Sequence, residues 1–251
     1  MMTTEAASYR WNTSDAAEAY DAAAPVIHPC YVEVQDAILE QLPYGHEDAF
    51  ELVDIGAGSG RLAERVLEQF AGARVTLVDQ SAPFLALAER KLARFAPRAA
   101  FMESRLQGNW AAELNAAPNA IVSTSAIHHL ESAEKRALYR VCFETLAPGG
   151  MFINGDEFRP ADDGAFLALL EEWSAHMRSA IANGDIPGSF ATTFDAWHDR
   201  NIRRFGDPKK SGDDCLETLE VQQGYLRDAG FATTEPAWAK KLWAVLIAQK
   251  T

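Results

Sequence analysis

Short apolar runs alternate with segments of helical spacing along most of this chain. Five of these runs indicate buried strands, at residues 51–55, 73–79, 99–103, 120–123 and 151–154. Helical stretches follow the first, second and fourth runs, with apolar side chains recurring at helical spacing. Strands that alternate with helices form parallel sheets covered on both faces. The pattern therefore predicts an α/β protein built on one doubly wound sheet.

Residues 1–7 are expected to be disordered, and helical spacing begins at residue 11, ahead of the first strand. A first helix should be capped within residues 12–14, and Pro25 should interrupt it because proline has no backbone N–H to donate. A second helix should open at Pro29. The sequence thus predicts two helices before the sheet begins.

The chain has a different character after the fifth strand. Residues 157–215 predict two helices, the first starting at residue 162 or 163 and the second following residue 192 or 193. The densest basic run, residues 203–210, is typical of a solvated loop. A helix capped by Thr218 and closed by Gly230 then leads into two strands that should pair with each other.

A glycine-rich turn joins the first strand to its helix. Gly56, Gly58 and Gly60 occupy alternate positions, and glycine allows positive φ angles and the close approach of a ligand to the backbone. The helix starting at residue 61 directs free N–H groups and its positive dipole end at this turn, so a carboxylate or phosphate could be held there. The dinucleotide fingerprint needs a glycine where this chain has Arg61.

Asp54 is a second departure from the dinucleotide fingerprint. A carboxylate two residues before the first glycine suits an amine or a sulfonium better than a pyrophosphate. The pattern D-x-G-x-G-x-G resembles motif I of the class I S-adenosylmethionine-dependent methyltransferases, of the small-molecule, type 12-like kind. A helix–Pro148-Gly149-Gly150–strand unit and the terminal helix with its two strands resemble the same family.

The resemblance implies a Rossmann-like, doubly wound sheet of seven strands with the last strand antiparallel. Residues 1–50 would form an N-terminal helical lid. Residues 51–251 would form the methyltransferase domain, with a helical cap inserted at about residues 157–215. The implied cofactor is S-adenosylmethionine, which leaves as S-adenosylhomocysteine.

The resemblance also assigns cofactor contacts along the first strand and its turn. Asp54 would support the glycine loop or bind the amine, and the methionine part would be cradled by Gly56, Ala57, Gly58 and Gly60.

Asp79 ends the second strand, where an acid in a Rossmann-like sheet reaches the ribose hydroxyls. Gln80 would flank the adenine, which would be framed by Ser104, Arg105 and Leu106. Many members of the family carry an aspartate where Arg105 stands, and arginine cannot accept a hydrogen bond. Glu103, Asn109 or a backbone carbonyl are the alternatives for the adenine contact.

The fourth strand is followed by two serines and two histidines, namely Ser123, Ser125, His128 and His129. The resemblance places motif IV here and implies contacts from the serines to the methionine part. A histidine could act as general base for the acceptor, and His128 is the candidate. Adjacent loop residues usually point apart, so at most one histidine should face the substrate, and a structural role at the sheet edge is the alternative. Ser132 is expected to cap the next helix.

In many members of the family an N-terminal helical segment folds over the cofactor. Tyr20 is accordingly assigned to the cofactor, and His28 and Tyr31 to the acceptor. The insertion is where such enzymes often build an acceptor-specific cap, which adds Trp173, Trp197 and Arg203 as acceptor contacts. For the tryptophans, a place in the hydrophobic core is the favoured alternative.

Composition narrows the choice of partners. The chain of 251 residues carries a formal net charge of −13, which argues against broad contact with nucleic-acid phosphates. Its three cysteines lack the spacing of a disulfide framework or a zinc site, and no metal is expected. No stretch approaches the ~20 apolar residues of a membrane span. We therefore expect a cytoplasmic protein without a membrane partner.

The resemblance implies transfer of a methyl group to an acceptor, with a small molecule favoured by the acidic composition. One alternative is a tRNA-modifying enzyme that uses an S-adenosylmethionine-type cofactor and residues 203–210. A second is a non-catalytic S-adenosylmethionine-binding protein. A third, an NAD-dependent dehydrogenase, is disfavoured by Arg61 and by the terminal strand pair. The sequence leaves open whether the protein forms a homodimer.

Overall fold

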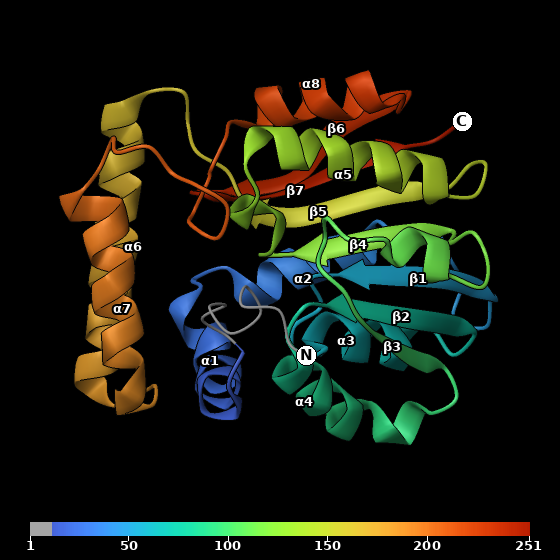
Figure 1. Cartoon of the computed structure of the whole chain (residues 1–251), viewed down its shortest axis with the longest axis horizontal. Helices are drawn as coiled ribbons and strands as arrows, with labels where there is room; N and C mark the ends of the chain where they lie inside the picture. The colour runs from blue at the N-terminus through green and yellow to red at the C-terminus, as the bar shows by residue number, and fades with distance from the viewer. Residues whose placement is uncertain (1–11) are drawn as a thin grey trace.

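A seven-stranded sheet forms the centre of the protein, which a computed structural model describes for residues 12–251 (Figure 1). The order across the sheet is β3-β2-β1-β4-β5-β7-β6. Strands β1 to β5 run parallel, and β7 is antiparallel to both of its neighbours. The predicted Rossmann-like sheet with an antiparallel last strand is therefore confirmed. The strands are β1 (Phe50–Ile55), β2 (Ala73–Asp79), β3 (Ala99–Glu103), β4 (Ala120–Thr124), β5 (Met151–Glu157), β6 (Thr233–Lys240) and β7 (Trp243–Gln249).

Helices cover both faces of the sheet because successive residues of each parallel strand bury side chains on opposite sides. In β1, Leu52 packs into one hydrophobic core and Val53 into the other. The first core includes α2 (Tyr31–Glu40), α3 (Arg61–Gln69) and α4 (Ala82–Leu92). The second includes α5 (Ser132–Thr145) and α8 (Leu219–Ala229). The sheet is thus doubly wound, as the sequence predicts.

The first helix, α1 (Ser14–Ile27), begins at the cap Thr13, whose side chain accepts a hydrogen bond from the N–H of Ala16. The expectation that Pro25 interrupts this helix is wrong, because Pro25 lies inside it. A proline leaves the carbonyl four residues earlier without its helical donor. That carbonyl belongs to Asp21, and Nη2 of Arg61 donates to it at 2.7 Å. A tertiary contact therefore replaces the missing helical hydrogen bond.

The insertion after β5 forms α6 (Asp163–Asn183), capped by Asp162, and α7 (Ala191–His198). These helices pack side by side at one end of the sheet, with α1 next to them (Figure 1). The prediction that the second helix follows residue 192 or 193 is wrong, because α7 begins at residue 191, directly after a 3-10 turn, Gly188–Phe190.

Two smaller features complete the fold. The cap of α5 is Glu131 rather than Ser132, since Glu131 and Glu134 form a reciprocal capping box. Within residues 12–251, no helix combines the length and the apolar character that crossing a membrane requires. The prediction of disorder for residues 1–7 falls outside the described residues.

Candidate cofactor and acceptor site

A cavity of about 840 Å³ lies where β1, β2 and β4 end. Most of the residues predicted to bind the cofactor line it, namely Tyr20, Asp54, Gly56, Ala57, Gly58, Asp79, Gln80, Ser104, Arg105, Leu106 and Ser125. Two do not. Gly60 lies at the start of α3, and Ser123 is fully buried with its hydroxyl donating to the carbonyl of Ile55 at 2.8 Å. The sheet thus gathers residues from five separate parts of the sequence around one cavity.

The glycine turn adopts the left-handed backbone that only glycine takes without strain. The φ angles are +71° at Gly56, +53° at Gly58 and +76° at Gly60. The N–H groups of Gly56 and Ala57 both donate to the carbonyl of Val78, at 2.8 and 3.1 Å, which fastens the turn to β2. No atom lies within 4 Å of where a Cβ of Gly58 would be. The backbone at Gly58 is therefore bare towards the cavity.

Asp54 presents a buried carboxylate to this cavity. Its residue is 1% exposed, and Oδ2 has no hydrogen-bond partner among residues 12–251. Burial, together with the nearby charge of Asp79, raises the pKa of Asp54 to about 7. A buried carboxylate oxygen without a partner is unfavourable unless a ligand supplies a donor or a positive charge. The amino group of S-adenosylmethionine fits this need.

Asp79 organises the neighbouring backbone. Its two carboxylate oxygens accept from the N–H groups of Gly58 and Ser81, each at 2.8 Å. Burial raises the pKa of Asp79 to about 6, although hydrogen bonds from the Ser81, Gly58 and Gln80 backbone oppose the rise. An ionised carboxylate offers about four acceptor positions. The acceptor capacity that these bonds leave over suits a hydroxyl of a ribose.

The predicted adenine contacts lie next to Asp79. The N–H of Ser104 donates to the carbonyl of Asp79 at 2.9 Å, and residues 103–107 line the cavity. Asn109 is not among the lining residues. Of the two side chains considered in place of Arg105, Glu103 is therefore the one that could accept a hydrogen bond from adenine.

Asp21 fastens α1 to the glycine turn. Its carboxylate accepts from the Ser59 hydroxyl, from Nε of Arg61 at 2.8 Å and from Nζ of Lys91 at 3.3 Å. Burial by itself raises the pKa of Asp21, but the Ser59 hydrogen bond and the two cations outweigh it and lower the pKa. We call these four side chains the α1 latch. The latch holds α1, and with it Tyr20, against the cavity.

Replacing Asp21 with asparagine is expected to loosen α1 without unfolding the sheet. The change removes the ion pairs to Arg61 and Lys91, and a loss of about 1.4 kcal/mol would make local opening roughly tenfold more frequent. Amide hydrogen exchange across residues 14–27 measures this opening. Glu18→Gln is the matched control, because Glu18 lies on the same helix and pairs with Arg90 at 3.5 Å in a largely exposed position. Equal exchange in the two variants would contradict the latch.

The two histidines after β4 differ from expectation. They lie on a 3-10 turn, Ile127–His129, and their rings do not point apart, because the ring centroids are 4.0 Å from each other. Nδ1 of His128 lies 2.6 Å from Oδ1 of Asp156 and 2.7 Å from Oε2 of Glu157. His129 lines the cavity, whereas His128 is not among the lining residues.

The surroundings of His128 do not favour the general-base role predicted for it. Burial by itself lowers the pKa of His128, but the Glu157 and Asp156 carboxylates outweigh burial and raise the pKa well above its usual value. An imidazole that already holds its proton cannot accept another one.

Of the residues predicted to contact the acceptor, only Tyr31 lines the cavity. His28 lies behind Tyr20, with Nε2 at 3.1 Å from the Tyr20 hydroxyl. Trp173 is part of the hydrophobic core, where its indole N–H donates to the carbonyl of Ile27 at 2.6 Å and its ring packs against Trp197. Arg203 is exposed outside the cavity.

The structure adds lining residues that sequence reasoning missed. Lys210, Ser211, Gly212 and Asp213 reach the cavity from the end of the insertion, and Asp21 reaches it from α1. Lys210 ends the basic run at residues 203–210, whereas no local pattern in the sequence marks the others. Asp156 and Glu157 do not line the cavity but contact His128. The sequence could have marked them as site residues, since like Asp79 they are acids at the end of a buried strand.

Comparison with known proteins agrees with this geometry. Residues 53–152 match a family described as Methyltransferase domain. A trans-aconitate 2-methyltransferase of Paracidovorax citrulli (strain AAC00-1) is 33% identical over 103 residues, which is 41% of this chain and 37% of that protein. The chain therefore aligns with well under half the length of this curated relative.

Solved structures extend the likeness to the fold. An O-methyltransferase family protein from Burkholderia thailandensis superposes with a TM-score of 0.67 at 17% identity, covering 99% of this chain and 62% of that one. Human N-acetylserotonin methyltransferase, in complex with SAM, gives 0.65 at 14% identity, covering 100% of this chain and 60% of that one. The resemblance to class I S-adenosylmethionine-dependent methyltransferases is thus confirmed, by sequence for residues 53–152 and by fold for the chain.

Proposed function

We propose that the chain transfers the methyl group of S-adenosylmethionine to a small-molecule acceptor. The observation that carries this proposal is the buried carboxylate of Asp54, with an unpartnered Oδ2 beside a glycine turn that leaves its backbone bare. An amino group supplies the donor and the charge that this oxygen lacks. The cavity of about 840 Å³ is within the range of roughly 300–1,000 Å³ that small-molecule sites occupy.

The residues present can bind and align such a cofactor. S-adenosylmethionine, when bound, supplies a methyl group on a sulfonium, which is already an activated electrophile. The chain then contributes proximity and orientation. Asp54 would accept from the amino group, the backbone at Gly58 would lie along the methionine part, and Asp79 would accept from a hydroxyl of the ribose. Tyr20 and Tyr31 would wall the cavity and exclude water.

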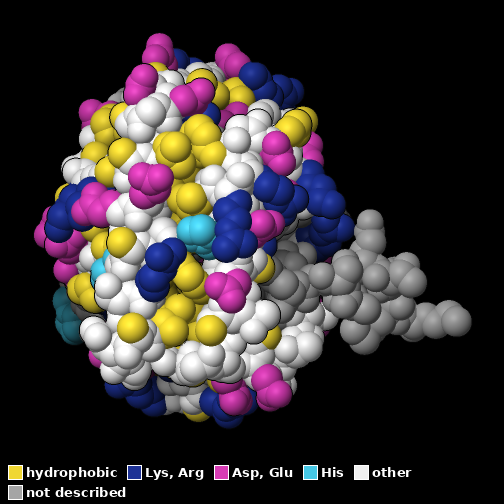
Figure 2. Space-filling model, turned by 90° about the vertical axis from the view of Figure 1, so that its left-hand side faces the viewer, with side chains coloured by type: hydrophobic (Ala, Val, Ile, Leu, Met, Phe, Trp, Pro, Cys, Tyr) yellow, Lys and Arg dark blue, Asp and Glu magenta, His cyan; other side chains and the backbone are white. Residues whose placement is uncertain are grey.

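A small-molecule acceptor is supported by the charge of the surface as well as by the net charge of −13. On the face drawn in Figure 2, Lys and Arg side chains are interspersed with Asp and Glu. Within the basic stretch, Arg204 pairs with Asp199 at 2.9 Å, and neighbouring Arg200 with Asp213 at 3.7 Å. Nucleic-acid binding depends on basic residues that are available to phosphates. A cytoplasmic location completes the proposal, and the oligomeric state stays open.

Calorimetric titration of the purified protein with S-adenosylmethionine, S-adenosylhomocysteine and NADH tests the cofactor. We expect micromolar binding of the first two and none of NADH. A screen of carboxylate, phenol and amine acceptors, with tRNA alongside, then tests the acceptor. Turnover of tRNA alone would favour the tRNA-modifying alternative, and cofactor binding without any turnover would favour the non-catalytic one. Failure to bind either sulfur compound would overturn the proposal.

Replacing Asp79 with asparagine should weaken cofactor binding by about 1–3 kcal/mol, the usual effect of losing hydrogen bonds to a charged group. Asparagine keeps one oxygen for the N–H of Gly58 or Ser81, so the turn itself should persist. The same titration measures the effect, and Asp228→Asn serves as control, because Asp228 is exposed and pairs with Arg136 at 3.4 Å. Unchanged affinity in a folded variant would remove the ribose assignment.

A further inference from the structure

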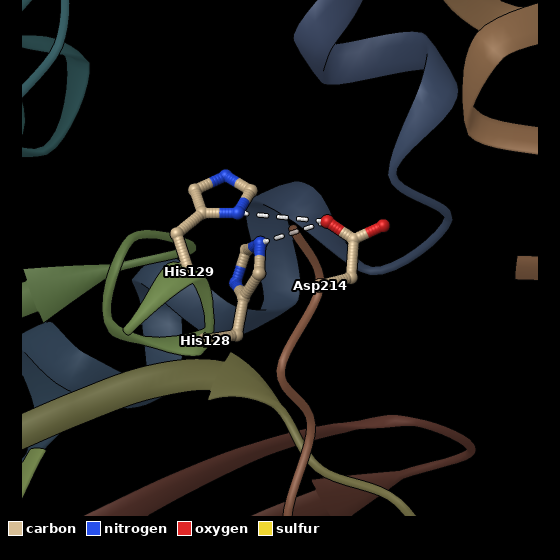
Figure 3. A group of neighbouring side chains, drawn as sticks. All are labelled: His128, His129 and Asp214. Carbon is tan, nitrogen blue, oxygen red and sulfur yellow. Dashed lines mark ion pairs between the residues drawn. The ribbon is translucent and has the colours of Figure 1, made fainter. Parts of the chain in front are cut away.

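Two histidines and one aspartate converge beside the cavity, from segments far apart in the sequence (Figure 3). His128 and His129 come from the 3-10 turn after β4, and Asp214 comes from the segment that joins the insertion to α8. Oδ1 of Asp214 lies 3.8 Å from Nε2 of His128 and 3.5 Å from Nδ1 of His129. All three atoms lie within 4.8 Å of one another, and His129 and Asp214 are only partly buried.

Asp156 fixes the orientation of the His128 ring. Its Oδ2 accepts from the backbone N–H of His128 at 2.9 Å, and its Oδ1 lies 2.6 Å from Nδ1 of the ring. With Nδ1 directed at a carboxylate, Nε2 is the nitrogen that faces Asp214. Metal-binding histidines show the same arrangement, in which the nitrogen opposite the metal donates to a carboxylate.

Backbone hydrogen bonds hold the aspartate segment against the histidine turn. The N–H of Gly212 donates to the carbonyl of His129, and the N–H of Cys215 to the carbonyl of His128, both at 2.8 Å. The side-chain amide of Asn201 donates to Oδ2 of Asp214, which leaves Oδ1 directed at the histidines. The three side chains are thus positioned by contacts of their own, as binding sites for ions require.

We propose that Nε2 of His128, Nδ1 of His129 and Oδ1 of Asp214 bind a divalent transition-metal ion, with Zn²⁺ the best match to this donor set. Three protein ligands of imidazole and carboxylate type, with a fourth position open, are typical of zinc sites that act on a ligand. Tetrahedral bonds of about 2.0–2.1 Å place ligand atoms roughly 3.3 Å apart. The observed 3.5 and 3.8 Å need to contract by only a few tenths of an ångström.

The charges at the site agree with a bound cation. Asp156 and Glu157 lie behind His128, fully buried, and they favour positive charge on the side of the ring that faces Asp214. The ion takes the place of a ring proton at Nε2 of His128. At His129, Nδ1–H donates to the carbonyl oxygen of Asp213 at 3.1 Å, so an ion at Nδ1 replaces that proton and requires the carbonyl to move aside. Because His129 lines the cavity, the open position is available to water or to an oxygen or nitrogen of a small molecule there.

Metal titration of the full chain, stripped with a chelator, tests the site without reference to methyl transfer. We expect one equivalent of Zn²⁺ to bind, and His129→Ala and Asp214→Asn each to lower the affinity at least tenfold. Asp214→Asn keeps the shape of the side chain and an oxygen for Asn201. His46→Ala is the matched control, because His46 is exposed and lies 3.5 Å from the carboxylate of Glu47, remote from the cavity. Its affinity should equal that of the unmodified protein.

Spectroscopy on the unmodified protein keeps the test independent of how the variants fold. Co²⁺ in the site should give the visible absorption of a tetrahedral ion, and X-ray absorption at the zinc edge should show two imidazole ligands. Absence of stoichiometric Zn²⁺ binding overturns the proposal, as does binding that both variants leave unchanged. If the protein binds Zn²⁺ but does not bind S-adenosylmethionine, the metal site is supported and the proposed function is contradicted.

Discussion

Replacing Asp54 with asparagine is expected to weaken S-adenosylmethionine binding while making the cofactor-free protein more stable. The loss of affinity should be about 1.5–3 kcal/mol, because an amide cannot replace the charge that the carboxylate offers to an ammonium group. In the unmodified protein, affinity should also fall as the pH drops below about 7, since burial and the charge of Asp79 raise the pKa of Asp54 to about 7.

The gain in stability follows from proton linkage. The pKa of Asp54 is higher in the folded protein than the ordinary 3.8, so the folded state binds the proton more tightly than the unfolded state does. Its contribution to the free energy of unfolding is therefore fully present below about pH 4 and is lost as the pH rises through about 7. Asparagine does not titrate and has no such loss. At pH 8 the free energy of unfolding of the variant should therefore exceed that of the unmodified protein by about 2–4 kcal/mol.

Denaturant unfolding of both proteins at pH 8 and pH 5, without cofactor, measures this difference, which should shrink at the lower pH. Glu51→Gln is the control, because Glu51 lies on the same strand but is half-exposed, near Arg74. The Glu51→Gln variant should not show the gain in stability at pH 8 that is expected for Asp54→Asn. A variant at Asp54 that is less stable at pH 8, or that binds S-adenosylmethionine normally, would show that this carboxylate is not held ready for a ligand.

Replacing Gly56 with alanine should destabilise the fold by about 2–5 kcal/mol. An alanine Cβ at this position would lie 2.4 Å from Cβ of Ala126, far inside van der Waals contact, and neither backbone can move freely. The φ angle of +71° adds a penalty of about 1–2 kcal/mol for any residue with a Cβ. The free energy of unfolding, obtained from a urea titration, measures the combined effect of the contact with Ala126 and the φ penalty.

Gly58→Ala is the comparison that separates these two causes. Its φ angle is +53°, but nothing lies within 4 Å of the new methyl group. Only the backbone penalty applies, while the methyl group extends into the cavity and should reduce cofactor affinity. Equal loss of stability in the two variants would mean that the contact with Ala126 does not restrict position 56.

Much of the framework could be predicted because it depends on local order. Apolar runs that alternate with helical stretches dictate a doubly wound sheet, and parallel strands bring their carboxyl ends together whatever the details of packing. The resemblance to methyltransferases, placed on this framework, then assigned Asp54, the glycine turn, Asp79 and residues 104–106 to one cavity. The error at Pro25 arose where a side chain has a partner far along the sequence. Arg61 donates to the carbonyl of Asp21 that Pro25 leaves without its helical donor.

The acceptor side shows the opposite case. Trp173 and Trp197 were assigned to the acceptor, with the core as the favoured alternative, and the packing of α6 and α7 places Trp173 in the core and Trp197, partly buried, against it. His128 and His129 were expected to point apart, yet a 3-10 turn and the segment ending at Asp214 bring both rings to one carboxylate.

The sequence by itself thus determined the order of strands and helices and the class of the sheet, because short-range spacing encodes these features, and its resemblance to methyltransferases implied the residues that face the cofactor. Only the tertiary structure decided the α1 latch, the core position of the tryptophans and the His128–His129–Asp214 cluster. The latch joins residues 38 to 70 positions apart, and the cluster joins His129 to a residue 85 positions further along the chain. They depend on the angles at which α1 and the insertion pack, which no local pattern specifies.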